Sequence, residues 1–166
     1  MKAKTLLLAL LIVTALVGLW KWRNSHDPAG QVRRSLEELR VLVSFERDES
    51  PITKESIIQK ILGRVTQDIT LEVNQPSAGK GLISGREEFR EYLRLGRYGS
   101  EYLRLNLFDP KVTLGDSSNS AEVTATAKAD TNLYKDSYWQ EVVLSFIRED
   151  GSWLLKRVTT VKTWGR

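Results

Sequence analysis

The sequence predicts an α+β domain that follows a single transmembrane helix. Three observations lead to this prediction: a long apolar run near the start, helical spacing of apolar residues after it, and strand-like alternation beyond residue 64. Helices followed by a series of strands are typical of α+β domains. About 136 residues follow the apolar run and its linker, enough for one domain with a single core.

The transmembrane prediction rests on residues 5–22, in which Lys21 is the one charged residue. As a helix rising about 1.5 Å per residue, this stretch spans roughly 27 Å, close to the hydrocarbon core of a bilayer at about 30 Å. Trp20 and Trp22 suit the membrane interface. We therefore expect a short basic tail over residues 1–4, a membrane anchor over 5–22 and a linker over 23–30.

A cleaved secretory signal is the alternative, because a basic start and an apolar stretch are typical of both. Cleavage after Ala15 would leave several apolar residues on the new terminus, which favours the uncleaved anchor. The short tail resembles that of a signal anchor, so we expect a single-pass protein of the cell membrane. Its domain is then expected on the non-cytoplasmic side, although basic residues at both ends of the run discriminate poorly.

The charge balance argues against a nucleic-acid partner. The chain has 25 Lys and Arg against 21 Asp and Glu, and four of the basic residues precede Asn24. The domain is therefore formally neutral, without the basic excess that nucleic acid requires. It has no cysteine, and the one histidine, His26, lies in the linker. We therefore expect no metal and no cofactor, because the common metal ligands and proton-transfer groups are missing.

The expected elements follow from apolar periodicity and from turn residues. Residues 31–47 and 53–63 have helical spacing, and residues 65–73 alternate as a strand does. A loop rich in Pro, Ser and Gly separates this strand from a third helix. The remaining strands are expected over residues 102–107, 111–114, 121–131, 138–148 and 152–163.

Two short motifs mark the third helix and the last hairpin. Ser84 and Glu87 have the spacing of a capping box, in which each side chain bonds a backbone amide at the helix start. Residues 149–152 form a tight hairpin turn in which Gly151 can adopt positive φ.

With these motifs, residues 31–164 resemble the nuclear transport factor 2-like superfamily. The similarity rests on the element order, on Ile83–Phe89 and on Asp150–Leu155, which are similar to the polyketide-cyclase-like and ketosteroid-isomerase-like branches. The resemblance implies a curved antiparallel sheet wrapped around three helices, a cystatin-like cone with an internal pocket. Members include isomerases, dehydratases and non-catalytic binding domains, so the fold alone does not settle the function.

The candidate pocket residues come from the last two strands. If Ile147 pairs near Trp153, one face of this hairpin carries a polar and aromatic set that the resemblance would point into the cone. The set is Trp139, Glu141, Trp153, Arg157 and Thr159. Glu141 and Arg157 would then be close enough to pair. Alternatively, Arg157 holds an anionic ligand group. A third option is that Glu141 acts as a general base, although Arg157 would lower the pKa of Glu141 and so weaken it in that role.

Two functions remain open. The favoured one is a membrane-tethered, non-catalytic module that binds a small ligand or a protein, with a possible homodimer through the opposite sheet face. That face would carry Tyr138, Leu144, Phe146, Leu154, Val158 and Trp164. The alternative is an isomerase or dehydratase-like enzyme with Glu141 or Asp130 as base. Its expected hydrogen-bond donors are Tyr98, Tyr102 and Tyr134.

The third helix also carries an arginine stripe, formed by Arg86, Arg90, Arg94 and Arg97. Such a stripe could meet anionic lipid headgroups. Glutamates within the same helix favour a solvated, salt-bridged face instead.

Overall fold

The computed structural model describes residues 27–47, 49–75, 79–133 and 135–164. The predicted tail and anchor, and most of the predicted linker, lie outside these ranges. Within them, no helix is both long enough and apolar enough to cross a bilayer.

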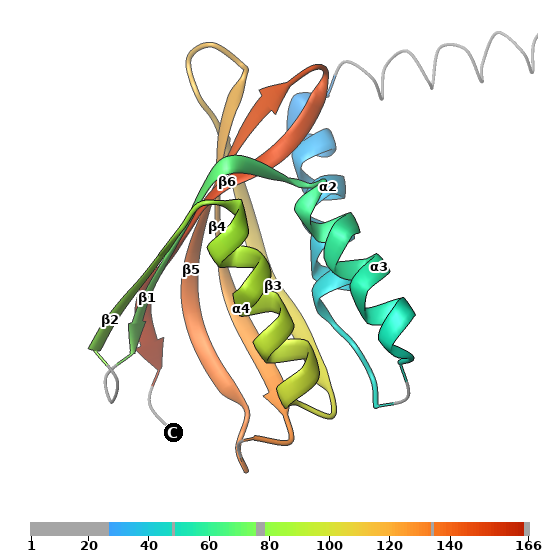
Figure 1. Cartoon of the computed structure of the whole chain (residues 1–166). Helices are drawn as coiled ribbons and strands as arrows, with labels where there is room; N and C mark the ends of the chain where they lie inside the picture. The colour runs from blue at the N-terminus through green and yellow to red at the C-terminus, as the bar shows by residue number, and fades with distance from the viewer. Residues whose placement is uncertain (1–26, 48, 76–78, 134, 165–166) are drawn as a thin grey trace, which may run out of the picture.

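Three helices and six strands make up the described part of the chain (Figure 1). In chain order they are α2 (Pro28–Val43), α3 (Pro51–Leu62), β1 (Val65–Gln75), β2 (Gly79–Ser84), α4 (Arg86–Gly99), β3 (Leu103–Leu114), β4 (Ser120–Thr131), β5 (Tyr138–Glu149) and β6 (Ser152–Trp164).

Helix α2 ends earlier than the sequence predicts because its last residues turn to cover the edge of the sheet. Phe45 and Leu103 of β3 exchange two backbone hydrogen bonds, of 2.8 and 3.0 Å. Next to them, Ser44 Oγ accepts from the Leu105 amide at 3.1 Å, and Arg40 Nη1 donates to the Leu105 carbonyl at 3.0 Å. The end of α2 thus satisfies backbone groups that an edge strand would otherwise expose.

The start of α4 differs from the predicted capping box. The N-cap is Gly85, whose φ of 87° and ψ of 155° lie in a region that only glycine adopts readily. Ser84 precedes the cap, and its amide donates to Glu88 Oε2 at 2.8 Å, so Glu88 rather than Glu87 bonds back to the turn. The prediction of the helix was correct, and its cap is shifted by one residue.

The six strands form one sheet in the order β2-β1-β6-β5-β4-β3. The prediction of an entirely antiparallel sheet was wrong at one place, because β1 and β6 pair in parallel. Strand β2 occupies part of the predicted loop. The two strands expected over residues 102–114 are one strand, β3, whose register shifts between Phe108 and Lys111.

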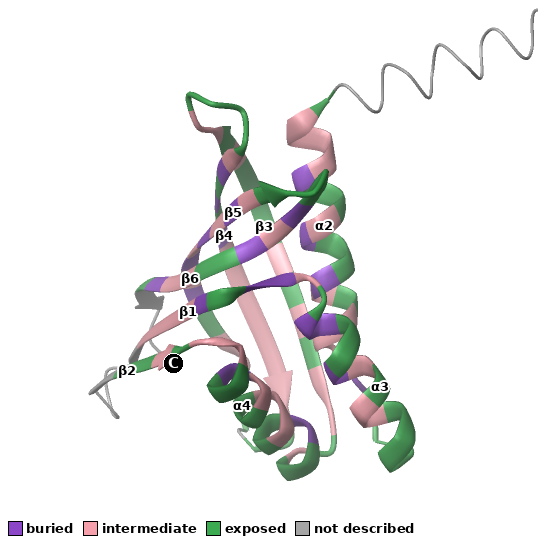
Figure 2. Cartoon of the chain, turned by 45° about the horizontal axis from the view of Figure 1, so that its top comes forward, coloured by how far each residue is buried: buried purple, intermediate pink, exposed green. Residues whose placement is uncertain are grey.

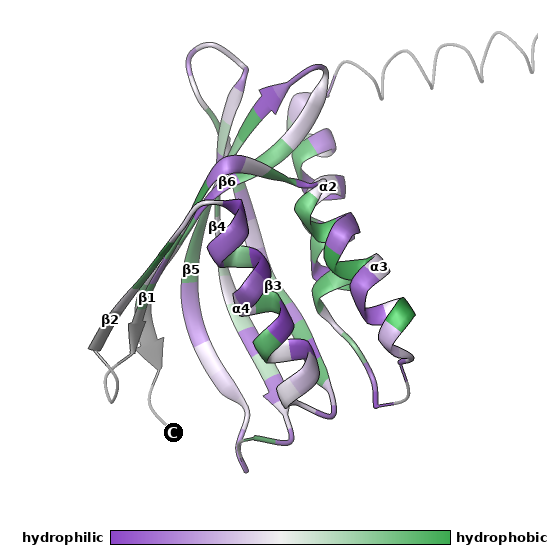
Figure 3. Ribbon diagram, viewed as in Figure 1, coloured by the Kyte–Doolittle hydropathy of each residue, from purple (hydrophilic) through white to green (hydrophobic). Residues whose placement is uncertain are grey.

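The sheet is strongly curved, and the helices lie on its inner face (Figure 1). Helix α2 packs against β3, and α4 packs against β1. Buried residues concentrate where the sheet meets the helices (Figure 2), and hydrophobic residues mark the sides of α2 and α3 that turn toward the sheet (Figure 3). The inner faces of β4 and β5 contribute Ala121, Val123, Ala125, Val142, Leu144 and Phe146 to this core.

Candidate functional site

Strand β5 presents the face opposite to the one that we predicted. Gln140, Val142, Leu144 and Phe146 are buried beneath the helices. Trp139 and Glu141 alternate with these residues and therefore lie on the outer face of the sheet, which no helix covers. The predicted inward direction of Trp139 and Glu141 was wrong.

Two features of the hairpin explain the outcome. Ile147 pairs with Leu154 and not with Trp153, so Trp139 and Glu141 lie on the face opposite to Trp153. A β-bulge then changes the phase of β6. Phe146 pairs with Leu155, but the next pair along β5 is Ser145 with Arg157, which leaves Lys156 as an extra residue. Trp153 therefore lies inward as predicted, and it is 3% exposed. Beyond the bulge the alternation changes phase.

Arg157 and Thr159 follow the bulge and lie on the outer face, opposite Ser145 and Val143 respectively. The predicted ion pair between Glu141 and Arg157 does not form. Arg157 Nε instead lies 3.9 Å from Glu72 Oε1 of β1. Of the five candidate pocket residues, only Trp153 reaches the interior, and a ligand-binding role for any of them stays a prediction.

Two inward-facing polar groups of β6 already have hydrogen-bond partners. The indole N–H of Trp153 donates to Gln31 Oε1 of α2 at 3.2 Å. Thr160 is buried and donates to the Glu72 carbonyl at 3.3 Å. Among the residues that the structure describes, the buried polar or charged ones are Thr66, Arg97, Gln140 and Thr160, with no carboxylate.

The outer face carries an aromatic cluster, which we define as Phe108 and Trp139, and Lys128 lies beside it. The rings of Phe108 and Trp139 stack with their centroids 5.4 Å apart, and Lys128 Nζ lies 5.7 Å from the Trp139 centroid. Phe108 is 42% exposed and Trp139 is 37% exposed. Large exposed aromatic side chains of this kind are typical of protein-binding surfaces.

The acids proposed for catalysis lie on this outer face as well. Asp130 pairs with Arg104 across the strands and contacts Lys128 Nζ at 3.1 Å. The hydrogen bonds that Ser137 and Lys128 donate hold the pKa of Asp130 below its usual range, which weakens it as a base. Tyr98 lies on α4, and Tyr134 lies outside the described residues.

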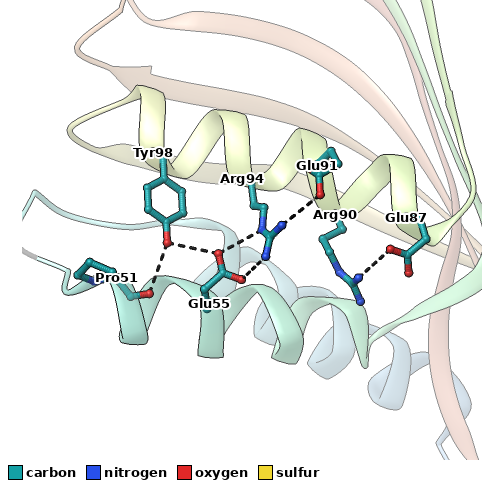
Figure 4. A network of polar contacts seen from close by, with 7 residues as sticks. All are labelled: Pro51, Glu55, Glu87, Arg90, Glu91, Arg94 and Tyr98. Atoms are coloured by element: carbon teal, nitrogen blue, oxygen red, sulfur yellow. Dashed lines mark hydrogen bonds and ion pairs between the residues drawn. The ribbon is translucent and has the colours of Figure 1, made fainter.

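Two arginines of the α4 stripe, Arg90 and Arg94, form salt bridges with glutamates, as predicted (Figure 4). Arg94 donates from Nε and Nη2 to both oxygens of Glu55 on α3, at 3.1 and 2.9 Å. This interaction lowers the pKa of Glu55. Tyr98 also donates to Glu55, at 3.3 Å, and burial raises the pKa of Tyr98. The network joins α3 to α4.

The other arginines of the stripe also donate hydrogen bonds within the chain. Arg90 bonds Glu87 at 2.7 Å, and Arg86 donates to the Val65 carbonyl. Arg97 is 3% exposed and donates from Nε and Nη2 to Glu49 at 2.8 and 3.1 Å. The sequence shows the spacing of these arginines and the glutamates of α4, but not that Glu55 and Glu49 of other segments pair with Arg94 and Arg97.

A surface groove between α2 and α3, of about 470 Å³, was not predicted. It is lined by Glu37, Glu38, Val41, Leu42, Lys60, Gly63 and Arg64. In the part of the chain that the structure describes, no three His, Cys, Asp or Glu side chains are grouped as a metal site requires.

A curved sheet closed by three helices defines a nuclear transport factor 2-like, or cystatin-like, fold. Comparison with solved structures agrees. A nuclear transport factor 2-like protein of unknown function from Pseudomonas putida KT2440 has a TM-score of 0.60 and 11% identity, over 80% of this chain and 84% of its own.

Two further structures are similar. A predicted scytalone dehydratase from Novosphingobium aromaticivorans has a TM-score of 0.58 and 13% identity, over 89% of this chain and 88% of its own. A protein from Nostoc punctiforme with a cystatin-like fold has a TM-score of 0.57 and 11% identity, over 78% of this chain and 86% of its own. No family model and no curated protein matches the sequence. At such low identity, the likeness establishes the fold alone.

Proposed function

We propose that this protein is a membrane-tethered, non-catalytic binding module that engages a protein partner through the outer face of its sheet. The observation that carries the proposal is the exposed aromatic cluster of Phe108 and Trp139 on a sheet face that no helix covers. Buried aromatic anchors dominate the energetics of protein interfaces. A small ligand in the cone is less favoured, because the indole N–H of Trp153 already bonds Gln31.

The alternative is an isomerase or dehydratase, and a predicted scytalone dehydratase is among the structural neighbours. Such an enzyme needs a base inside the cone. Glu141 and Asp130 lie on the outer face, and none of the carboxylates described by the structure is buried. This arrangement favours binding over catalysis.

The tether is proposed from residues 5–22 and is tested separately from the binding surface. We expect the full chain to stay in the membrane pellet after alkaline carbonate extraction. Protease added outside the cytoplasm should digest the domain, whereas protease added to the cytoplasmic side should not. A fully extracted chain, shortened near Ala15, would show a cleaved signal instead.

The binding surface is tested by photo-cross-linking in intact cells. p-Benzoylphenylalanine at Trp139 should yield discrete adducts above the 18.9 kDa of the chain. The matched control is the same substitution at Ile52, which is 84% exposed on α3 and far from the outer face in the fold. Absence of adducts at position 139, or the same adducts at both positions, would overturn the proposed surface.

A further inference from the structure

The two edges of the sheet differ in how far they are protected. Strand β3 forms one edge and β2 the other (Figure 1). At β3, Phe45 bonds the backbone of Leu103, and farther along the strand Pro110 lies within the register shift that interrupts the edge. At β2, Glu88 accepts a hydrogen bond from the amide of Ser84, the last residue of the strand. The residues of β2 before Ser84 have no comparable cover among the described residues.

The hydrogen bonds between β1 and β2 show which backbone groups point away from the sheet. The Gly85 amide donates to the Ile69 carbonyl at 2.8 Å. Because hydrogen-bonded pairs alternate along antiparallel strands, every second residue of β2 counted back from Gly85 bonds β1. The residues between them direct their N–H and C=O groups to the free edge, and these residues are Ser84, Leu82 and Lys80.

Leu82 lies in the middle of this open stretch. Its side chain is 63% exposed, and its backbone N–H and C=O have no hydrogen-bond partner among the residues that the structure describes. Its neighbour Ile83 packs against the core, which holds β2 in place as a strand. A fixed strand with open backbone groups is a template for pairing with a further strand.

We propose that two copies of this chain pair along their β2 strands, antiparallel, about a two-fold axis at Gly81. Lys80 of each copy then stands opposite Leu82 of the other. In each such pair the two residues exchange both of their free backbone groups, N–H to C=O. The inference goes beyond the proposed function, because it uses the edge of the sheet and not its outer face.

Glu88 selects this register. A pairing centred on Leu82 would bring the Lys80 carbonyl of one copy to the Ser84 amide of the other. The Glu88 carboxylate already occupies that place, 2.8 Å from the Ser84 nitrogen. A pairing centred on Gly81 leaves Ser84 outside the paired stretch. Gly81 then faces its own counterpart at a non-hydrogen-bonded position, where Cα atoms approach to about 4.5 Å.

A second copy fits this edge because the open stretch is short and ends at Glu88. An extended segment of an unrelated protein that continued along β2 would meet the Glu88 carboxylate beside Ser84. The β2 strand of a second copy has the same open groups, at Lys80 and Leu82, and the same end. Each open group therefore finds a partner, and the symmetry closes the assembly at two copies.

Disulfide trapping tests the position of the axis. The chain has no cysteine, and a Cβ at Gly81 would meet no atom within 4 Å, so Gly81→Cys adds a single thiol without a clash. In the full chain, with diamide as the oxidant, Gly81→Cys should form a disulfide-linked species of twice the mass of the chain. The expected Cα separation of about 4.5 Å lies within the range that a disulfide spans.

Leu82→Cys is the matched control, because it places an exposed thiol on the adjacent residue. Its two copies would lie about 8 Å apart across the axis, too far for a disulfide. Leu82→Cys should therefore link about tenfold more slowly than Gly81→Cys or not at all. Equal rates, or faster linkage at position 82, would overturn the inference.

A proline tests the hydrogen bonds themselves. Leu82→Pro removes an N–H that faces the free edge and no bond to β1, so a Gly81→Cys/Leu82→Pro chain should fold and lose the rapid disulfide. Circular dichroism and the rate of disulfide formation measure the two effects. A folded double variant that still links as fast, or one that does not fold, would contradict the assigned edge.

The edge and the outer face are tested separately. p-Benzoylphenylalanine at Leu82 should give an adduct of twice the mass of the chain. An adduct of another mass would show that another protein occupies the edge, and it would overturn the second copy, as would the absence of any adduct. Adducts at Trp139 bear on the outer face alone, so either proposal can fail without the other.

Discussion

At the scale of single residues, the ion pair between buried Arg97 and half-buried Glu49 stands apart from the more exposed ion pairs. The Arg97 guanidinium makes two hydrogen bonds to Glu49, donates to the Leu42 carbonyl at 3.0 Å and lies 4.9 Å from the Phe45 ring centroid. It therefore ties the end of α4 to the segment that joins α2 to α3. A buried charge that loses its partner is strongly destabilising, whereas an exposed pair contributes little.

We expect Glu49→Ala to lower the free energy of unfolding by about 3–5 kcal/mol, because it leaves the Arg97 guanidinium buried without a counter-charge. Glu46→Ala is the matched control, because the pair of Glu46 and Arg104 is exposed on both sides. It should cost less than about 1 kcal/mol. Urea denaturation followed by circular dichroism measures both, and equal losses would contradict the assigned role of the buried pair.

At the scale of elements, the bulge at Lys156 decides which side chains of β6 face the helices. Leu155 before it is buried, and Val158 after it packs against the same core. An uninterrupted strand would place Val158 and Leu155 on opposite faces. The bulge therefore keeps apolar residues inward on both of its sides and moves Arg157 outward.

Deletion of Lys156 should be tolerated, because every flanking residue keeps its partner and its face when the extra residue is removed. We expect a loss of about 1–2 kcal/mol in the free energy of unfolding. Deletion of Val143 in the regular part of β5 should prevent folding, since it forces either Val142 outward or Glu141 inward. Circular dichroism shows whether each deletion variant folds, and thermal melting measures its stability. Similar stability of the two variants would contradict the assigned register.

At the scale of the whole molecule, the sheet has one packed face and one open face. Phe146 on the inner face is fully buried at 0% exposure, whereas Phe108 on the outer face is 42% exposed. The same residue type therefore stabilises the core on one side and, in the proposed function, binds a partner on the other.

Phe146→Ala should lower the free energy of unfolding by about 3–5 kcal/mol through lost packing and a cavity. Phe108→Ala should change it by less than about 1 kcal/mol and should weaken binding at the outer face instead. Thermal melting measures the first effect, and the yield of photo-adducts at Trp139 in the Phe108→Ala chain measures the second. An unchanged adduct yield would contradict the proposed use of the outer face.

Much of the fold was predictable because it depends on local pattern. Helical spacing in α2 and α3, alternation in β4 to β6 and the turn at Gly151, whose φ is 79°, all follow from neighbouring residues. Strand β2 was missed, because a short edge strand between glycines has little local signal. The parallel pairing of β1 with β6 joins segments about 90 residues apart, which no local pattern records.

The sequence by itself determined the order of helices and strands, the neutral charge of the domain and the resemblance to a cone of helices and sheet. Only the tertiary structure decided which face of each strand is inside. Alternation defines two faces but does not say which one the helices cover, and one extra residue at Lys156 exchanges them along β6. Arg157 and Thr159 lie on the open surface because of this extra residue, whereas Trp139 and Glu141 lie there because Ile147 pairs with Leu154 and not with Trp153.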